Sequence, residues 1–304
     1  MSATDTLNAP RGPGSAMKIV ELSSAPSAVS LYTAAVGASS KRMAAVDRLP
    51  ELTYVRPDVQ VDAGHVARYA QVCGFTREQG VPLTYPHMLA FPLHMKLICS
   101  SSFPWPVMGT VHLTNSVRQH RRIHAGDRLR VEATFGPLTA HDKGQLFSLL
   151  TRVLRDGGLV WESESVNLRM GVRTPKGPAF ESALVYATPL SRQAEFSAPS
   201  GIGRRYGRVS GDLNPIHLSA VSAKLFGFKR AIAHGMWTKA RTLAMLLPQQ
   251  QPVDQMLAQV EFKTPLFLPG RATLWTGALP DATLFEVRNG RGDKPHLRGK
   301  VGWS

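Results

Sequence analysis

Apolar residues recur at helical spacing in one segment of the C-terminal half, and strand-like segments follow it. Met236, Ala240, Leu243 and Leu247 lie three or four residues apart, and Pro248 ends the run, which predicts a helix. Segments bounded by Gly or Pro then predict strands near 256–264, 271–279, 282–288 and 296–303. In the N-terminal half, strands are predicted near 127–136, 145–155 and 158–169. One longer helix followed by antiparallel strands, in each half, predicts an α+β fold in which each sheet wraps around its helix.

An internal repeat relates the two halves. Three segments of the first half match segments of the second in the same order: Tyr69–Phe75 with Tyr206–Asp212, Leu93–Ile98 with Met236–Arg241, and Ile123–Gly126 with Phe267–Gly270. This order indicates duplication of one unit. We therefore divide the 304 residues into an extension rich in Ala, Ser, Gly and Pro, a first repeat, a linker and a second repeat, at 1–46, 47–175, 176–195 and 196–304. The extension is expected to be mobile or loosely docked.

The segment Tyr206–His217 sets one carboxylate and one imidazole around a tight turn that opens a helix. Pro215 suits the first helical position, and Asn214 is the expected N-cap, so the helix is predicted to run from Pro215 to Gly227. Asp212 then lies just outside the helix and His217 at its third position. Such a pair can hold and activate one water molecule. The alternative is that Asp212 only stabilises the turn through backbone amides.

A second candidate feature is Ala233-His234-Gly235, which precedes Met236 at the start of the longer helix. Unpaired N–H groups at a helix start suit a developing oxyanion, and glycine allows close approach to its backbone. The alternative is that Gly235 only packs tightly and that His234 bonds locally.

The two repeats differ at these positions. In the alignment, the counterpart of Asp212 is Phe75, that of His217 is Gly80, and that of Gly235 is Pro92, which has no N–H. The first repeat has therefore lost the acid, the imidazole and the amide donor together. This indicates that the second repeat carries the chemistry and the first supports it.

The string Tyr206-x-x-Val-Ser-Gly-Asp-x-Asn-Pro-Ile-His217, followed by Ala233-His-Gly235, resembles the MaoC-like, (R)-specific enoyl-CoA hydratase family. The chain from about residue 47 onward is similar to its double hot-dog members, in which the first repeat is degenerate. Tyr85–Pro92 and Gly109–His112 also resemble bacterial acyl dehydratases of this type.

The resemblance implies that Asp212 and His217 are catalytic, holding the water that adds to a trans-2-enoyl thioester or leaves an (R)-3-hydroxyacyl thioester. It implies that the Gly235 amide binds the thioester carbonyl, while Asn214 and Ser210 order the loop. It requires no metal and no redox cofactor, with CoA only as part of the substrate. The first repeat is expected to widen the groove beside its longer helix for the acyl tail.

The net charge of +15 fits an anionic ligand. Apart from Arg118-Gln-His-Arg-Arg122 the basic residues are scattered, and no nucleic-acid-binding signature is present. The phosphates of CoA are one candidate partner; Lys229, Arg230 and Lys263 are weak candidates for contacting them. A solvated basic surface remains the alternative.

Two cysteines, Cys73 and Cys99, form no recognisable framework, and no apolar run approaches a membrane span. We therefore expect a cytoplasmic enzyme. Its two repeats would form a pseudo-dimer, and a true homodimer stays open. Acyl carrier protein could replace CoA as the carrier. Two alternatives to a hydratase remain: a hot-dog thioesterase, and a non-catalytic acyl-thioester-binding subunit.

Overall fold

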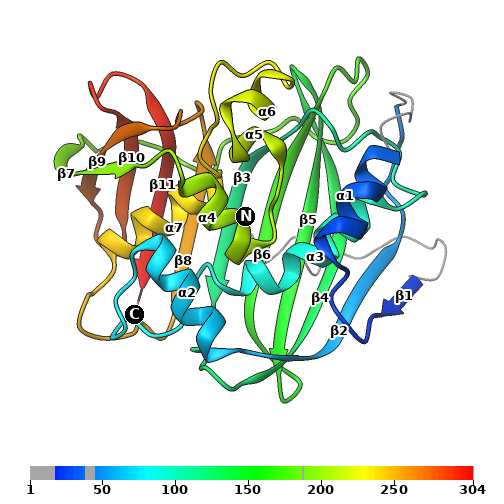
Figure 1. The fold of residues 1–304 in the computed structure, drawn as a ribbon, viewed down its shortest axis with the longest axis horizontal. Helices are drawn as coiled ribbons and strands as arrows, with labels where there is room; N and C mark the ends of the chain where they lie inside the picture. Colours follow the sequence, from blue (N-terminus) through cyan, green and yellow to red (C-terminus); the bar gives the residue numbers. More distant parts are fainter. Residues whose placement is uncertain (1–17, 38–44, 187, 304) are drawn as a thin grey trace.

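Eleven strands form one curved sheet in the computed structural model, which describes residues 18–37, 45–186 and 188–303 (Figure 1). The strands are β1 (Lys18–Glu21), β2 (Leu52–Gln60), β3 (Thr110–Gln119), β4 (Arg128–His141), β5 (Gly144–Arg155), β6 (Gly158–Met170), β7 (Ser191–Ala198), β8 (Met256–Phe262), β9 (Gly270–Ala278), β10 (Thr283–Asn289) and β11 (Pro295–Trp303). The helices are α1 (Ala28–Gly37), α2 (Ala63–Cys73), α3 (Pro86–Cys99), α4 (Ile202–Ser210), α5 (Pro215–Leu218), α6 (Ala220–Lys224) and α7 (Gly235–Leu246).

The strand order shows the duplication directly. One half of the sheet runs β2-β4-β5-β6-β3 toward the middle, and the other runs β7-β9-β10-β11-β8. Each half thus places its first, third, fourth, fifth and second strands in the same order. The halves join where β3 pairs with β8 antiparallel, from Thr114 opposite Glu261 to Gln119 opposite Met256. The predicted α+β, double hot-dog architecture is confirmed.

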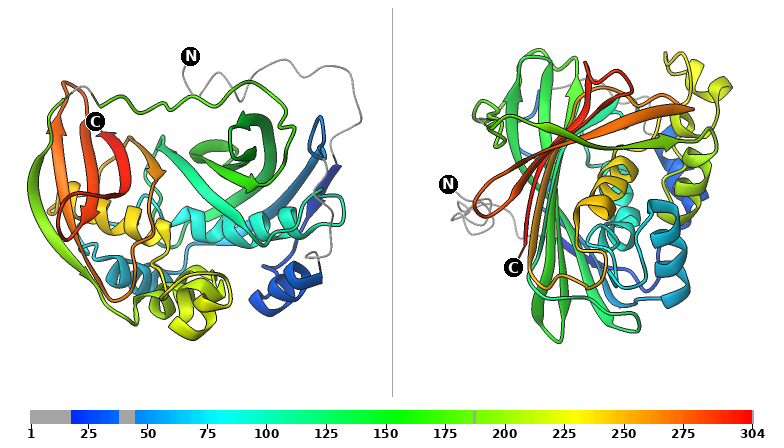
Figure 2. Two further views of the ribbon diagram at one scale, coloured as in Figure 1. Left: turned by 90° about the horizontal axis from the view of Figure 1, so that it is seen from above. Right: turned by 90° about the vertical axis from the view of Figure 1, so that its left-hand side faces the viewer.

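The longer helix of each repeat lies against the sheet, which curves around α3 and α7 (Figure 2). Both helices are buried over most of their length, with Leu93 and Leu97 of α3 and Ala240 and Leu243 of α7 fully covered. Burial on this scale explains why α7 is stable despite its β-branched and aromatic residues, because packing outweighs intrinsic propensity. The helix predicted from the Met236–Leu247 spacing is therefore confirmed, and it ends at Leu246.

A buried lysine ties α7 to both repeats. The Lys239 side chain has no exposed surface, and its Nζ donates to Asn115 O at 3.2 Å, Asn115 Oδ1 at 2.6 Å and Ala258 O at 3.1 Å. Burial holds the pKa of this lysine well below its usual value. The three acceptors match the three donors of an ammonium group. Because Asn115 lies on β3 and Ala258 on β8, this contact fixes α7 at the junction of the repeats.

The structure differs from the sequence-based boundaries in three places. Strand β7 begins at Ser191, inside the segment assigned to the linker, because it pairs with β9. The helix predicted from Pro215 to Gly227 is two short helices, α5 and α6, since Ser219 leaves the helical conformation and caps α6. Within the predicted extension, β1 pairs with β2 and α1 contacts α3; residues 1–17 and 38–44 lie outside the described residues.

Three histidines with lowered pKa values should make the fold sensitive to acid. Burial lowers the pKa of His94 and of His234 to about 3, and that of His112 to about 4. Because these folded-state pKa values lie below the unfolded value, the unfolded chain binds more protons once the pH falls below about 6.5. The contribution that the neutral rings make to the free energy of unfolding is therefore fully present above that pH. It should fall by about 1.4 kcal/mol per pH unit for each histidine as the pH drops toward the folded-state pKa.

Chemical denaturation between pH 6.5 and pH 4.5 tests this expectation. His94 contacts Thr151 Oγ1 through Nε2 at 2.6 Å, a contact that glutamine can imitate. In His94→Gln, the dependence of the unfolding free energy on pH should be shallower than in the wild type by about 1.4 kcal/mol per pH unit. Equal slopes in the two proteins would show that His94 titrates normally in the folded chain.

Candidate active site

The loop between α4 and α5 begins with a left-handed glycine, and so does the corresponding loop after α2 in the first repeat. Gly211 ends α4 with φ 76° and donates its N–H to Gly207 O. Gly74 ends α2 in the same way, with φ 82° and an N–H bond to Ala70 O. A positive φ is available to glycine without steric cost. The turn itself is thus shared, and what differs between the repeats is the residues that follow it.

Hydrogen bonds inside this loop fix the Asp212 side chain. Its carboxylate Oδ1 accepts the Asn214 N–H at 3.1 Å, and its own N–H donates to Ser210 Oγ at 3.1 Å. Asn214 in turn caps α5 by accepting the Ile216 N–H at 3.3 Å, as the sequence predicted. Asn214 thus holds the carboxylate through its N–H, and Ser210 holds the main chain of Asp212. The Asp212 side chain keeps 27% of its surface exposed, so solvent reaches it.

The hydrogen bond made by His217 determines its tautomer. Its Nδ1 lies 2.8 Å from Ile232 O, and a carbonyl oxygen can only accept, so Nδ1 carries the hydrogen. Nε2 is therefore the nitrogen with the lone pair. Burial lowers the pKa of His217, although the Asp212 charge and the bond to Ile232 act in the opposite direction. The imidazole is neutral near pH 7 and can accept a proton.

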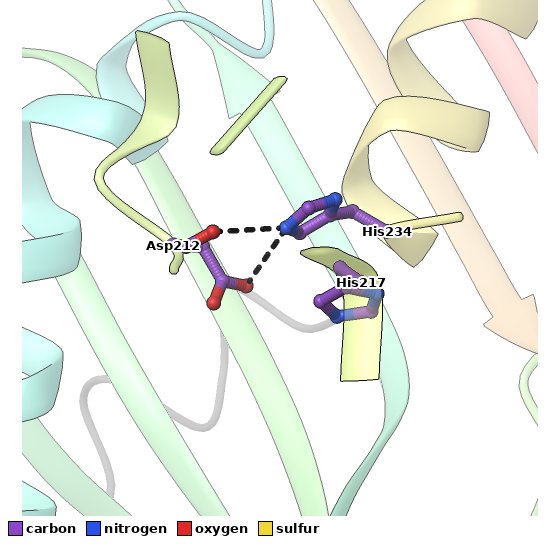
Figure 3. Close-up of side chains that lie close together, drawn as sticks. All are labelled: Asp212, His217 and His234. Atoms are coloured by element: carbon purple, nitrogen blue, oxygen red, sulfur yellow. Dashed lines mark hydrogen bonds and ion pairs between the residues drawn. The ribbon is translucent and has the colours of Figure 1, made fainter. Parts of the chain in front are cut away.

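His234 is a third member of the site (Figure 3). Its Nε2 donates to the main-chain oxygen of Asp212 at 3.0 Å and lies 3.8 Å from Asp212 Oδ2. Its ring stacks on His217, with centroids 3.7 Å apart. Burial, together with the nearby His217, lowers the pKa of His234 to about 3. The local bonding considered for His234 is wrong, because its partner lies 22 residues away; the Ala-His-Gly string was the signal for it.

Asp212, His217 and His234 therefore converge from three elements. One ligand atom of each lies within 4.8 Å of the others, a spacing that one bridging water molecule can span. One nitrogen of each ring is used as a donor to a main-chain oxygen, His217 Nδ1 to Ile232 and His234 Nε2 to Asp212. The other nitrogen of each ring keeps its lone pair and can accept a hydrogen bond from water.

Gly235 is the first residue of α7, directly after His234. Its N–H belongs to the first turn, where helical amides have no acceptor within the helix. A Cβ at this position would lie 2.8 Å from two carbons of the Phe262 ring, so only glycine fits without displacement. On β3, His112 packs against the same phenylalanine with ring centroids 4.8 Å apart. The first repeat thus contributes His112 to the surroundings of the site, a role that the sequence comparison missed.

The first repeat has no equivalent donor at the start of its long helix. The alignment paired Gly235 with Pro92, but Pro92 lies inside α3. That pairing does not bring the starts of the two long helices together. Helix α7 begins at Gly235, whereas α3 begins several residues before Pro92. The residue at the first position of α3 is Pro86, which also lacks an N–H.

The three candidate phosphate-binding residues flank the site without forming a group. Lys263 follows Phe262, and its Nζ lies 2.5 Å from Glu261 Oε2, so its charge is already paired. Arg230 contacts Pro269 O at 3.4 Å and lies over the Phe267 ring. Lys229 is exposed. Of these, Lys229 and Arg230 lie on the connection from α6 to α7, before Gly235.

Comparison with known proteins places the chain in a family. The MaoC like domain matches residues 192–273, a range that contains Asp212, His217 and Gly235. 3-Hydroxyacyl-thioester dehydratase X of Mycobacterium tuberculosis is 32% identical over 262 residues, which cover 84% of this chain and 90% of that protein. The chain belongs to the MaoC-like dehydratase family.

Several solved structures have the same fold. The crystal structure of HtdX from Mycobacterium tuberculosis superposes with a TM-score of 0.70 at 31% identity, over 82% of this chain and 98% of that one. A MaoC-like dehydratase from Phytophthora capsici gives 0.69 at 19% identity, over 83% and 94% of the two chains. A Mycobacterium tuberculosis protein with a double hotdog fold gives 0.51 at 14% identity, over 81% and 93%.

The cysteines and the helices add two observations about this MaoC-like chain. Cys73 is buried and Cys99 half-buried, and the two do not form a disulfide with each other. Within the described part of the chain, every helix is too short or too polar to cross a membrane.

Proposed function

We propose that this MaoC-like enzyme catalyses the reversible hydration of trans-2-enoyl thioesters to (R)-3-hydroxyacyl thioesters. The Mycobacterium tuberculosis relative is named for the dehydration of 3-hydroxyacyl thioesters. The observation that carries the proposal is the neutral His217, whose Nε2 has the lone pair and whose ring lies with the Asp212 carboxylate and His234 in one cluster, with ligand atoms within 4.8 Å of one another, at the start of α7.

The proton balance of hydration can be assigned to these groups. Asp212 accepts one hydrogen of the water and holds it in place. His217 Nε2 accepts the other hydrogen as the water oxygen bonds to C3 of the enoyl group. The resulting imidazolium then gives this proton to C2. Dehydration is the reverse: Nε2 takes the C2 proton, and the imidazolium returns it to the departing hydroxyl.

Negative charge appears on the thioester oxygen when water adds to C3. A fixed amide donor at that oxygen stabilises the enolate more than the substrate, which is the condition for catalysis. We assign this role to the Gly235 N–H. The close contact between Gly235 and Phe262 holds the amide in a defined place and lets the acyl group approach the backbone.

Every step uses side chains and one backbone amide, so we propose that the enzyme needs no metal and no redox cofactor. Treatment with excess EDTA followed by desalting should then leave the hydration rate unchanged. Loss of activity that Zn²⁺ or Mg²⁺ restores would contradict this and would reassign Asp212, His217 and His234 as metal ligands.

CoA is the carrier we propose, because its phosphates suit the basic chain of net charge +15. Lys229 and Arg230, which are exposed on the connection before Gly235, are the better placed of the three candidates. Lys263 is already paired with Glu261. A cytoplasmic location is proposed because the two cysteines do not form a disulfide with each other.

A spectrophotometric assay with trans-2-enoyl-CoA tests the function. The absorbance of the conjugated thioester should fall on addition of the enzyme, and a thiol reagent should detect no free CoA. Chiral analysis of the product should give the (R)-3-hydroxyacyl thioester. Release of free thiol without hydration would instead identify a thioesterase, and binding without turnover would identify a non-catalytic subunit.

A further inference from the structure

A cavity of about 760 Å³ lies between the first repeat and the connection from α7 to β8 of the second, away from the candidate active site. It is enclosed by α2, the loop that follows it, the turn after β3 and the connection from α7 to β8. Asp212, His217 and Gly235 are not among the residues that line it. It also lies beside α2 and not beside α3, where the groove for the acyl tail was expected.

The cavity corresponds by internal symmetry to the active site. Phe75 and Gly80, the counterparts of Asp212 and His217, both line it. The helix on its wall, α2, is the counterpart of α4, and both end in the same left-handed glycine turn. The first repeat has thus lost the acid and the imidazole but has kept a hollow at the equivalent place.

The chemistry of its walls suits an amphipathic anion. Its interior is mainly aliphatic, with Val66, Leu83, Ile123 and Leu247 all buried. Basic side chains also line it: Arg77, Arg122 and His124. Arg122 is half-exposed and pairs with Asp254 at 3.3 Å, and Arg77 is exposed. Among the described residues that line the cavity, none is acidic.

We propose that this cavity is a second, non-catalytic binding site for an acyl-CoA. The acyl chain would lie against the aliphatic wall, and the phosphates of CoA would lie at Arg77 and Arg122. The choice of ligand class rests on the function proposed above. The cavity volume is in the range of small-molecule sites, about 300–1,000 Å³. The basic run Arg118–Arg122, which the active site does not use, ends at this cavity.

The number of ligand molecules bound per chain tests the proposal. The probe is decanoyl-CoA, a saturated thioester that can be neither hydrated nor dehydrated, and the method is isothermal titration calorimetry. Ala67 lies on the exposed face of α2 and lines the cavity, so the larger side chain of Ala67→Trp should occupy part of the cavity and obstruct ligand binding. Arg68 is the next residue, is exposed and does not line the cavity, so Arg68→Trp is the matched control.

The wild type and Arg68→Trp should bind one molecule more per chain than Ala67→Trp does. The molecule that Ala67→Trp still binds shows that this variant is folded. A second comparison addresses the charge: Arg77→Glu should weaken the cavity site by about fivefold at low salt. Arg121→Glu, an exposed reversal outside the cavity, should not.

The proposal is overturned if Ala67→Trp and Arg68→Trp bind the same number of molecules, whether that number is zero, one or two. This outcome is distinct from failure of the proposed function, which is measured as hydration of enoyl-CoA. If the protein does not hydrate enoyl-CoA but binds one molecule of decanoyl-CoA that Ala67→Trp fails to bind, the second site alone is supported. Hydration with no such molecule would support the active site alone.

Discussion

Replacing His217 by alanine should lower kcat for enoyl-CoA hydration by about 10³-fold, within the range of 10²–10⁴ typical of a general acid–base group. The reason is that Nε2 is the lone-pair nitrogen, fixed in that state by the Nδ1 bond to Ile232 O. Asp212→Asn should cause a loss of similar order, because an amide is a weaker acceptor for the water. KM should change little, since neither group is assigned to binding of the acyl chain.

The measurement is steady-state loss of enoyl absorbance for purified variants of verified fold. Asp142→Asn is the matched control, because Asp142 is exposed and its ion-pair partner among the described residues is the neighbouring His141; this variant should retain wild-type kcat. A His217→Ala variant with more than a tenth of the wild-type kcat would remove this residue from the chemistry.

Gly235→Ala should lower kcat by about 10²-fold, although the amide that we assign to the thioester oxygen is still present. The new Cβ would lie 2.8 Å from the Phe262 ring, so the helix start or the ring must move. A displacement of about 1 Å can cost a reaction about 10²-fold in rate. Because the amide acts mainly in the transition state, kcat should fall more than substrate binding.

Two variants make this test specific. Gly235→Ala combined with Phe262→Leu should recover part of the lost kcat, since the smaller side chain gives the Cβ room. Gly37→Ala should have no effect, because a Cβ there meets nothing within 4 Å. Wild-type kcat in Gly235→Ala would contradict the role assigned to this backbone position.

The strands most visible in the sequence were those with strong alternation or clear turn residues. The strands predicted near 145–155 and 296–303 agree closely with β5 and β11. Strands β1, β2, β3 and β7 were not predicted. β2 contains Pro57 within LTYVRPDVQ, and β3 is polar, with few fully buried positions. Their pairing is determined by partners far away in the chain, which local patterns do not register.

The site was predictable where it depends on local sequence. The capping of α5 by Asn214 and the position of His217 both follow from residues within one turn of each other. The bond from His234 to Asp212 depends on how α7 docks beside the α4–α5 loop, and no spacing rule predicts it. The same holds for His112, which reaches Phe262 only because β3 and β8 pair across the repeats.

Asp212 and His217 are proposed to act together on one water molecule, and a double-mutant cycle on kcat distinguishes joint action from separate action. If they share one task, Asp212→Asn with His217→Ala should lose little more activity than the worse single variant, and we expect this strong non-additivity. Losses that simply multiply in the double variant would show that the two residues act independently and do not share one water molecule.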